Sequence, residues 1–203
     1  MQGYELSAIF YNSLQFADDD YSLDLEITEK GMATIALDGR FMLVQTFKQD
    51  RTQVPIGIYS LDLDDVKLAS RIFDKERAII NISLSGEDNA IVITSPGLSS
   101  TIRLIEPRKV TKGWKDIAIG TPSDHSTINL EFIKKLAKIK LPMIEERTKA
   151  KKDLAFTFHL SKSQACLAIS RPKNDLYSAI VVFMPMRDTE ESEPFKTLAD
   201  IDY

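Results

Sequence analysis

The pattern of apolar and polar positions divides the chain into three stretches of the same plan, each an amphipathic helix followed by about three short strands. The plan is clearest at residues 54–105, where a short apolar strand leads into apolar residues at helical spacing that end near Asp74. Alternating segments with turn residues between them follow, which is typical of antiparallel strands. The sequence therefore predicts an α+β fold built from repeated units. The units are expected at residues 4–48, 54–105 and 115–184.

The first unit begins with a helix predicted over residues 6–17, where the apolar residues lie on one face. Its opposite face holds Ala8, Tyr11, Asn12 and Gln15 and carries no lysine or arginine. Asp38-Gly39 is a strong signal for a two-residue hairpin between the second and third strands. The strands of this unit are expected at residues 21–28, 32–37 and 40–47, and those of the second at 56–59, 78–84, 90–94 and 100–105.

The third unit has a helix predicted over residues 130–141. Lys140 projects towards its apolar side, so we expect this side chain to snorkel or to mark fraying before Pro142. A short strand is expected before the helix, and three follow it. These strands are predicted at residues 114–119, 154–160, 164–169 and 177–184.

Two of the predicted helices carry a basic face opposite their apolar face. At about 100° per residue, the second helix gathers its cations within one arc, and so does the third. Such a stripe can be an ordinary solvated face or a contact for a polyanion, and both interpretations stay open. The recurrence of the stripe before similar strands strengthens the second interpretation. The cations are Lys67, Arg71 and Lys75 in one helix and Lys134, Lys135 and Lys138 in the other.

The composition argues against several classes of protein. The formal net charge of −4 over 203 residues argues against coating nucleic acid through bulk positive charge, although local basic faces remain possible contacts. The lone cysteine excludes an internal disulfide and fits a reducing compartment. No apolar run is long enough to cross a bilayer, and residues 1–13 do not have the features of a secretory signal. We therefore expect a cytoplasmic protein with no membrane association.

Enzyme chemistry has little support in the sequence. No phosphate-binding loop, dinucleotide fingerprint or nucleophile elbow is present. His125, His159 and Cys166 show no metal-ligand spacing, and Cys166 lies in an apolar run that is typical of a buried thiol. Asp18–Asp20 could bind a cation, but adjacent acids in a turn are more often simply solvated. We expect no catalytic residue, no metal site and no cofactor.

The polar stretch at residues 106–113 is the best candidate for a linker, because it contains Pro and Gly between two patterned regions. It separates a first domain at residues 1–107 from a shorter second domain at 108–187. Residues 188–203 form an acidic tail, which we expect to be disordered. The alternative is that Phe195, Leu198 and Ile201 form a short peptide that docks on a neighbour or partner.

The segment VPIGIYSLDLDDVKLASRIF, followed by AIINISLSGEDNAIVITS and STIRLIE, resembles a half-domain of the DNA sliding clamp family, particularly its phage type. INLEFIKKLAKIKLP, with LAFTFHLSKSQACLAISRP and SAIVVFM, resembles another. These ring-shaped proteins are the processivity factors of replicative polymerases. The resemblance covers about residues 6–184 and implies helices on one face of curved sheets. It also implies duplex DNA bound without sequence preference, a replicative polymerase and possibly a clamp loader as partners, and a homo-oligomeric ring.

Carried over to this chain, the resemblance implies that Lys67, Arg71, Lys75, Lys134, Lys135 and Lys138 face the DNA. Two features depart from the family. The first helix has no basic residue, and three units stand where a two-domain clamp has four. Four copies would supply the twelve units of a conventional ring. The alternative function is a phage-type α+β protein-binding module, such as an inhibitor or assembly chaperone, with no DNA role. A phage-encoded protein would act in the host cytoplasm.

Overall fold

The computed structural model describes residues 1–20, 23–47, 52–106, 130–140, 157–160, 166–170 and 177–183. Several predictions concern residues outside these ranges. They are the strand at residues 114–119, nearly all of the linker at 106–113, His125 and the acidic tail at 188–203.

Within these ranges the chain forms helices and two sheets of mostly antiparallel strands, which confirms the α+β prediction. A seven-stranded sheet has the order β5-β1-β2-β3-β11-β10-β9, and a four-stranded sheet has the order β4-β6-β7-β8. The elements are α1 (Gly3–Leu14), β1 (Leu23–Thr28), β2 (Gly31–Leu37), β3 (Phe41–Phe47), β4 (Thr52–Gln53), β5 (Gly57–Leu61), α2 (Leu63–Ile72), β6 (Asn81–Ser85), β7 (Ala90–Ser95), β8 (Leu98–Arg103), α3 (Leu130–Leu136), β9 (Thr157–His159), β10 (Cys166–Ser170) and β11 (Tyr177–Phe183).

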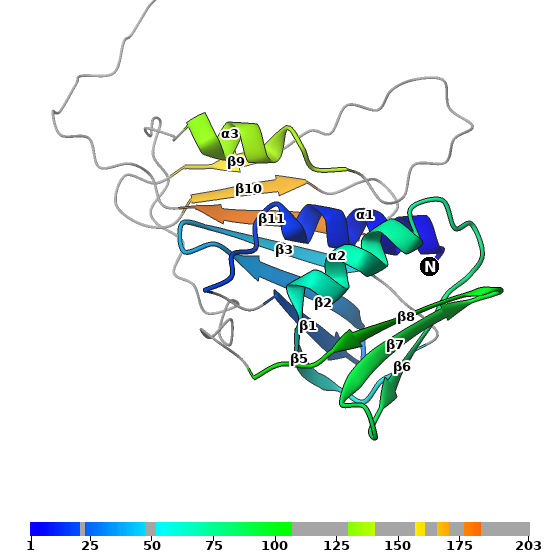
Figure 1. Ribbon diagram of the computed structural model, residues 1–203. Coiled ribbons are helices and arrows are strands. Elements are labelled where there is room, and N and C mark those ends of the chain that lie inside the picture. Colours follow the sequence, from blue (N-terminus) through cyan, green and yellow to red (C-terminus); the bar gives the residue numbers. More distant parts are fainter. Residues whose placement is uncertain are drawn as a thin grey trace, which may run out of the picture.

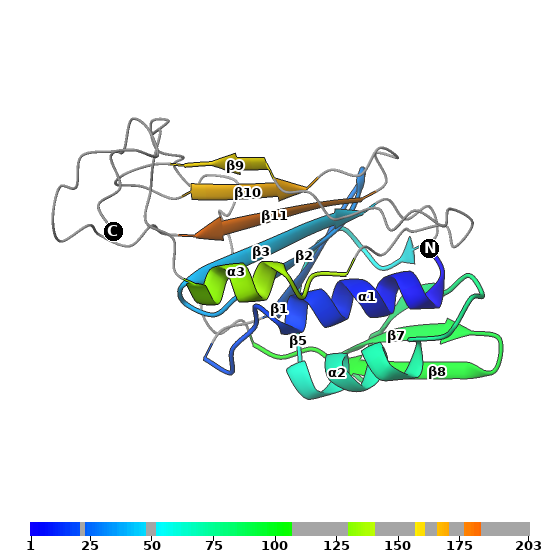
Figure 2. The same cartoon turned by 90° about the horizontal axis from the view of Figure 1, so that it is seen from above.

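The described helices lie on one side of the large sheet, as predicted. Figures 1 and 2 show α1, α2 and α3 in front of the seven strands, with α1 and α2 side by side and the small sheet beyond α2. Each of the three helices is followed by three antiparallel strands. The predicted repeat of three units is therefore confirmed for these residues.

The core lies between the helices and the large sheet. Alternate residues of each strand point to the same face, and Leu43 of β3 pairs with Ala36 of β2 and Val181 of β11. These residues belong to one buried cluster with Ile9 and Phe10 of α1. Residues of the opposite parity, such as Val44, form a smaller cluster on the other face of the sheet.

The predicted hairpin at Asp38-Gly39 is confirmed. Gly39 has a φ of 85°, a left-handed conformation that glycine adopts without a steric cost. The Asp38 carboxylate accepts hydrogen bonds from the backbone N–H groups of Arg40 (2.9 Å) and Phe41 (2.8 Å). The turn is therefore fixed by its own two predicted residues.

Two helices have other bounds than predicted, and α1, at Gly3–Leu14, both begins and ends three residues earlier. It begins at Gly3 because the Glu5 carboxylate accepts a hydrogen bond from the backbone N–H of Gln2 (2.7 Å) and caps the first turn. Gly3 belongs to this turn and lies so close to the chain that an added Cβ would be 2.6 Å from the Cβ of Glu76. α3 ends at Leu136 rather than at residue 141, and the chain continues in tighter turns, with Ile139 N–H donating to the Leu136 carbonyl (3.1 Å).

The prediction that Asn12 lies on a polar face of the first helix is wrong. Asn12 is completely buried, together with Ser7 and Ser13 of the same helix. The reason is that the sheet beneath α1 presents polar side chains at the matching positions: Ser13 Oγ donates to Thr34 Oγ1 (3.0 Å), and Asn12 donates to Gln45. Helical periodicity cannot distinguish a polar residue facing water from one facing a polar partner.

The seven-stranded sheet contains strands from both predicted domains. β11 pairs with β3 along its whole length, from Tyr177↔Phe47 to Phe183↔Phe41. The third unit therefore continues the sheet of the first unit. The boundary itself, at residues 107 and 108, stays a prediction.

Candidate nucleic-acid interface

A groove of about 600 Å³ runs between α1 and α2. α2 contributes Lys67 and Arg71, and α1 contributes Tyr11 and Gln15. Lys140, from the turn that follows α3, completes the basic side chains of the groove. The structure therefore brings together cations from two helical regions that are far apart in the sequence. Acidic residues also line the groove, namely Asp19, Asp64 and Asp74.

The groove exists because α1 and α2 pack closely through small residues. Ser7 Oγ donates a hydrogen bond to the Ser70 carbonyl (2.6 Å), and both serines are buried. Ser70 Oγ in turn donates to the Lys67 carbonyl (2.9 Å), one turn earlier. With the small side chains at the contact, the longer cationic side chains lie at the rim of the helix pair.

Lys140 is held in place by Asn12. Asn12 Nδ2 donates to the Lys140 carbonyl (2.7 Å), and Lys140 N–H donates to Asn12 Oδ1 (2.7 Å). The ammonium group lies 3.9 Å from the centre of the Tyr11 ring, a cation–π contact. The helix has already ended before Lys140, which agrees with the fraying expected before Pro142, and Asn12 sets the backbone of Lys140.

Asn12 belongs to a buried polar network beneath the groove. Gln45 Oε1 accepts hydrogen bonds from Asn12 Nδ2 (2.9 Å) and from the Tyr177 hydroxyl (2.8 Å). Gln45 Nε2 donates to the Ile9 carbonyl (2.9 Å). Burial raises the pKa of Tyr177, so its phenol keeps the proton that it donates. The network joins α1, β3, β11 and the end of α3, and it places Lys140 relative to α1.

The cations predicted on the third helix have different surroundings. Lys134 forms an exposed ion pair with Glu131 (3.0 Å). Lys135 is three-quarters buried, pairs with Asp38, donates to the Gln15 carbonyl (2.9 Å) and lies over the Phe16 and Phe41 rings. Its contacts attach α3 to the turn between β2 and β3. Lys138 is exposed beyond the helix end, and so is Lys75 after α2. None of these four lines the groove.

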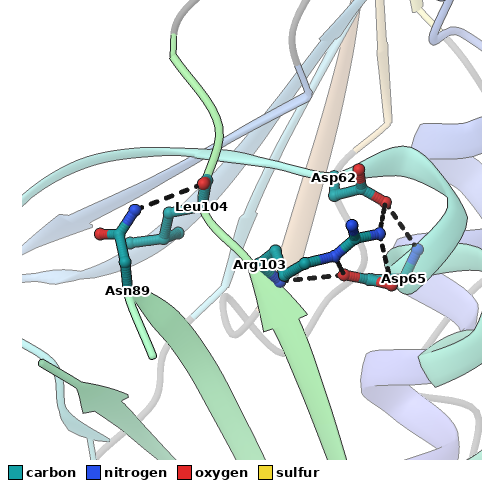
Figure 3. A network of polar contacts seen from close by, with 5 residues as sticks. All are labelled: Asp62, Asp65, Asn89, Arg103 and Leu104. Atoms are coloured by element: carbon teal, nitrogen blue, oxygen red, sulfur yellow. Dashed lines mark hydrogen bonds and ion pairs between the residues drawn. The ribbon is translucent and has the colours of Figure 1, made fainter. Parts of the chain in front are cut away.

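The position of α2 is set at its N-terminus by Arg103 from β8 (Figure 3). Asp62 caps the helix by accepting from the Asp65 N–H (3.1 Å), and Arg103 reaches both carboxylates: its Nε lies 2.7 Å from Asp65 Oδ2 and its Nη2 lies 3.2 Å from Asp62 Oδ1. The hydrogen bond from Arg103 lowers the pKa of Asp65. Asn89 holds the next residue of the chain, donating to the Leu104 carbonyl (3.4 Å). The small sheet is thus tied to the helix that carries Lys67 and Arg71.

The remaining candidates that lie within the described ranges, Asp18 and His159, belong to no group of metal ligands there. Among the described residues, no group of three or more His, Cys, Asp and Glu side chains could hold a metal ion. Asp18 accepts a hydrogen bond from the Asp20 N–H (3.0 Å) within its own turn, and His159 is exposed on β9. No helix in the described ranges combines the length and the apolar character needed to cross a membrane.

Comparison with solved structures identifies the architecture. A structure of A. fulgidus PCNA with the C-terminal region of FEN-1 bound matches over 94% of this chain and 98% of its own, with a TM-score of 0.64 and 10% identity. The DNA polymerase sliding clamp of Pseudomonas aeruginosa matches over 92% of this chain, with a TM-score of 0.66 and 14% identity. A putative DNA polymerase III beta subunit from Eubacterium rectale also matches over 92%, with a TM-score of 0.58 and 12% identity. The chain has the sliding-clamp fold.

This chain covers different shares of the proteins that it resembles. This chain spans nearly the whole PCNA chain but only 66% and 64% of the two bacterial chains. No family model matches the sequence, and no curated protein matches it. The expected likeness to phage clamps in particular stays a prediction. The resemblance stated from the sequence is confirmed at the level of the fold.

Proposed function

We propose that this protein is a DNA-tracking scaffold of sliding-clamp type. It binds duplex DNA without sequence preference through the side that carries the helices, and it tethers a polymerase or another replication factor. It performs no chemistry of its own. The proposal is supported by the fold together with one observation, the assembly of Lys67, Arg71 and Lys140 in a single groove on that side.

The charges of the groove favour loose binding. Three carboxylates, those of Asp19, Asp64 and Asp74, line the groove beside its three cations, so attraction to phosphates is offset. Lysine and arginine contacts to phosphates carry no sequence information and allow sliding. Retention on DNA would then depend on enclosure by several copies more than on contact strength. Four copies of this three-unit chain would supply twelve units for a ring, and loading such a ring onto DNA could require a clamp loader.

Lys75, Lys134 and Lys138 extend the proposed DNA-facing surface beyond the groove, since all three are exposed. Lys135 contributes through its position instead, because its ammonium group already pairs with Asp38. A phage origin and a host-cytoplasmic location belong to the same proposal. That the PCNA of A. fulgidus binds the C-terminal region of FEN-1 supports a tethering role for a chain with this fold.

The proposal is tested by charge reversal in the groove. We expect the double variant Lys67→Glu, Arg71→Glu to weaken binding to duplex DNA and to lower the slope of log affinity against log salt by about 0.9 for each lost phosphate contact. Fluorescence anisotropy with a labelled duplex at several salt concentrations measures both quantities. The matched control is Lys30→Glu, Arg40→Glu, which makes the same charge change at exposed turn residues outside the groove.

The control variant should keep both the affinity and the salt slope of the parent protein, apart from a small general effect of net charge. Equal losses of DNA affinity in the two double variants would mean that binding depends only on the overall charge of the protein. No DNA binding by the parent protein would reject the proposal. In that case the clamp fold would serve another purpose in this chain.

A further inference from the structure

The groove between α1 and α2 contains more than charged side chains. The half-buried Tyr11 and Leu14 of α1 and Leu63 of α2 give it an apolar part, and Gln15 adds an amide group. A protein contacts duplex DNA mainly through its phosphates and sugars, because the bases are stacked inside the helix. Such contacts make no use of an aromatic ring. The apolar part therefore indicates a ligand that presents flat, apolar groups together with phosphates.

The two helices that form the groove run antiparallel. The start of α1 lies beside the chain that follows α2, where the Tyr4 N–H donates to the Glu76 carbonyl (2.8 Å). About one turn further along α1, Ser7 Oγ donates to the Ser70 carbonyl (2.6 Å). A turn forward on α1 therefore corresponds to a turn backward on α2.

This geometry brings an aromatic ring and a cation to the same level of the groove. Tyr11 follows Ser7 by one turn of α1. Lys67 precedes Ser70 by one turn of α2, and Arg71 follows Lys67 by one turn on the same side of the helix. Proteins that bind single-stranded nucleic acid combine these two features, because a base stacks on the ring while the cations bind the backbone.

Lys140 adds a cation that already contacts the ring. Its ammonium group lies 3.9 Å from the centre of the Tyr11 ring. An aromatic ring holds a stacked base more strongly than it holds an exposed ammonium group. A base can therefore replace the ammonium group on the ring, and the flexible side chain then carries the ammonium group to the neighbouring phosphate. The backbone of Lys140 keeps its place, because Asn12 holds it through two hydrogen bonds (both 2.7 Å).

The carboxylates of the groove also fit an unpaired base. Asp64 comes three residues before Lys67 and Asp74 three residues after Arg71, so acids flank the pair of cations on this side of α2. Carboxylates repel phosphates but accept hydrogen bonds from the amino group of cytosine. In an unpaired cytosine the whole Watson–Crick edge is free to be bound. The mixed charge of the groove therefore suits a base with its phosphate better than a row of phosphates.

We propose that the groove binds an unpaired stretch of DNA, with a base stacked on Tyr11. The neighbouring phosphates are held by Lys67, Arg71 and Lys140. The volume of about 600 Å³ lies within the range of about 300–1,000 Å³ that small-ligand sites have, which suits about two nucleotides rather than a duplex. This inference rests on the proposed function, because it takes the helix side as the DNA-binding side. It adds that this side distinguishes a junction with a single strand from a continuous duplex.

Two DNA probes that differ only in their bases test the inference. Both are duplexes with a single-stranded overhang, made of deoxycytidines in one probe and of the same number of abasic sites in the other, so their phosphate charge is equal. The parent protein should bind the deoxycytidine overhang about tenfold more tightly in fluorescence anisotropy, because one base stacked on an aromatic side chain contributes about this much.

The variants ask whether the ring of Tyr11 causes this preference. Tyr11→Phe keeps the ring and should keep the preference for deoxycytidine, whereas Tyr11→Leu should lose it. Tyr59→Leu is the matched control, because Tyr59 is a half-buried tyrosine of β5 outside the groove. This control should keep the preference.

Photo-cross-linking of the unchanged protein locates the contact without any substitution. A 5-iododeoxycytidine in the overhang should cross-link to Tyr11, which mass spectrometry identifies, whereas the same base inside the duplex should not.

The outcomes separate this inference from the proposed function. Equal affinity of the parent protein for the two overhangs, or cross-links only to other residues, would overturn the inference, while binding of both probes would leave the proposed function standing. A preference lost in Tyr11→Phe, or lost equally in Tyr59→Leu, would also overturn it, because the ring in the groove would not be its cause. Binding to neither probe would reject the proposed function and the inference with it.

Discussion

Helices α2 and α3 carry similar sequence patterns, a basic stripe opposite an apolar face, but their surroundings differ. α2 packs along α1, and its Lys67 and Arg71 line the groove between the two helices. α3 lies on the sheet through Phe132, and its Lys135 pairs with Asp38. Leu130 and Ile133 of α3 are 66% and 42% exposed, whereas α2 contacts α1 at Ser70.

This comparison shows that the role of a cationic stripe depends on the element beside the helix. On α2 a neighbouring helix leaves the cations at the rim of a groove. On α3 the nearest partner is a carboxylate of a turn, which uses one of the three predicted cations as an anchor. The groove obtains its third cation from Lys140, outside both stripes. The pattern of cations along a helix therefore identifies charged helices, but it does not show which cations line the groove.

The largest effect is expected from the residue that attaches α3, but not α2, to the sheet. Phe132 is completely buried and stacks on Phe183, so we expect Phe132→Ala to lower the free energy of unfolding by about 3–5 kcal/mol. Hydrogen exchange should show α3 opening while α2 stays protected. Urea denaturation measures the free energy, and Lys134→Ala on the exposed side of the same helix is the control. A loss no larger than in this control would contradict the assigned anchor.

A smaller effect is expected where Asn12 joins α1 to the turn after α3. Asn12→Ala removes one of the two hydrogen bonds to Gln45 Oε1 and both hydrogen bonds to the backbone of Lys140, which should cost about 1–3 kcal/mol. Ser13→Ala removes the hydrogen bonds of Ser13 Oγ with Thr34 Oγ1 and Gln45 Nε2. It should cost less, because Gln45 Nε2 keeps the Ile9 carbonyl as an acceptor. Thermal unfolding compares the two variants. If Ser13→Ala were the more harmful change, the network would not be centred on Asn12.

The smallest effect concerns the anchor of α2. Arg103 lowers the pKa of Asp65 in the folded state, so the ion pair stabilises the protein above the pKa of the unfolded chain, near 3.9 for an ordinary aspartate. This contribution is lost as the pH falls through the lowered pKa. Arg103→Gln should therefore reduce stability slightly at pH 7, and the difference from the parent protein should shrink towards pH 3. A difference that grows on acidification would contradict this assignment.

Much of the fold could be predicted because it depends on local patterns. Alternating apolar residues and the Asp38-Gly39 turn specify the β1–β3 meander, and Asp62 supplies the cap of α2 within three residues. The spacing of apolar residues predicted which face of α1 and of α2 packs into the core. The order of these elements was then sufficient to indicate the clamp fold.

The site was less predictable because its partners are distant in the sequence. Asn12 and Lys140 are separated by 128 positions, and Asp38 and Lys135 by 97. Helical periodicity assigned Asn12 to a polar face and gave Lys140 no partner, whereas the structure joins the two residues by two hydrogen bonds. The one available signal was the run of Asn12 and Ser13 beside apolar residues, which indicates a buried polar contact only once Gln45 and Thr34 are known to face it.

The central claim, that the groove side faces duplex DNA, is tested most directly by lysine footprinting. The full protein is treated with an acylating reagent with and without duplex DNA, and the modified lysines are counted by mass spectrometry. We predict that DNA protects Lys67 and Lys140, whereas Lys30 in the β1–β2 turn is modified at the same rate in both samples. Unchanged modification of Lys67 and Lys140, or protection of Lys30 instead, would contradict the account.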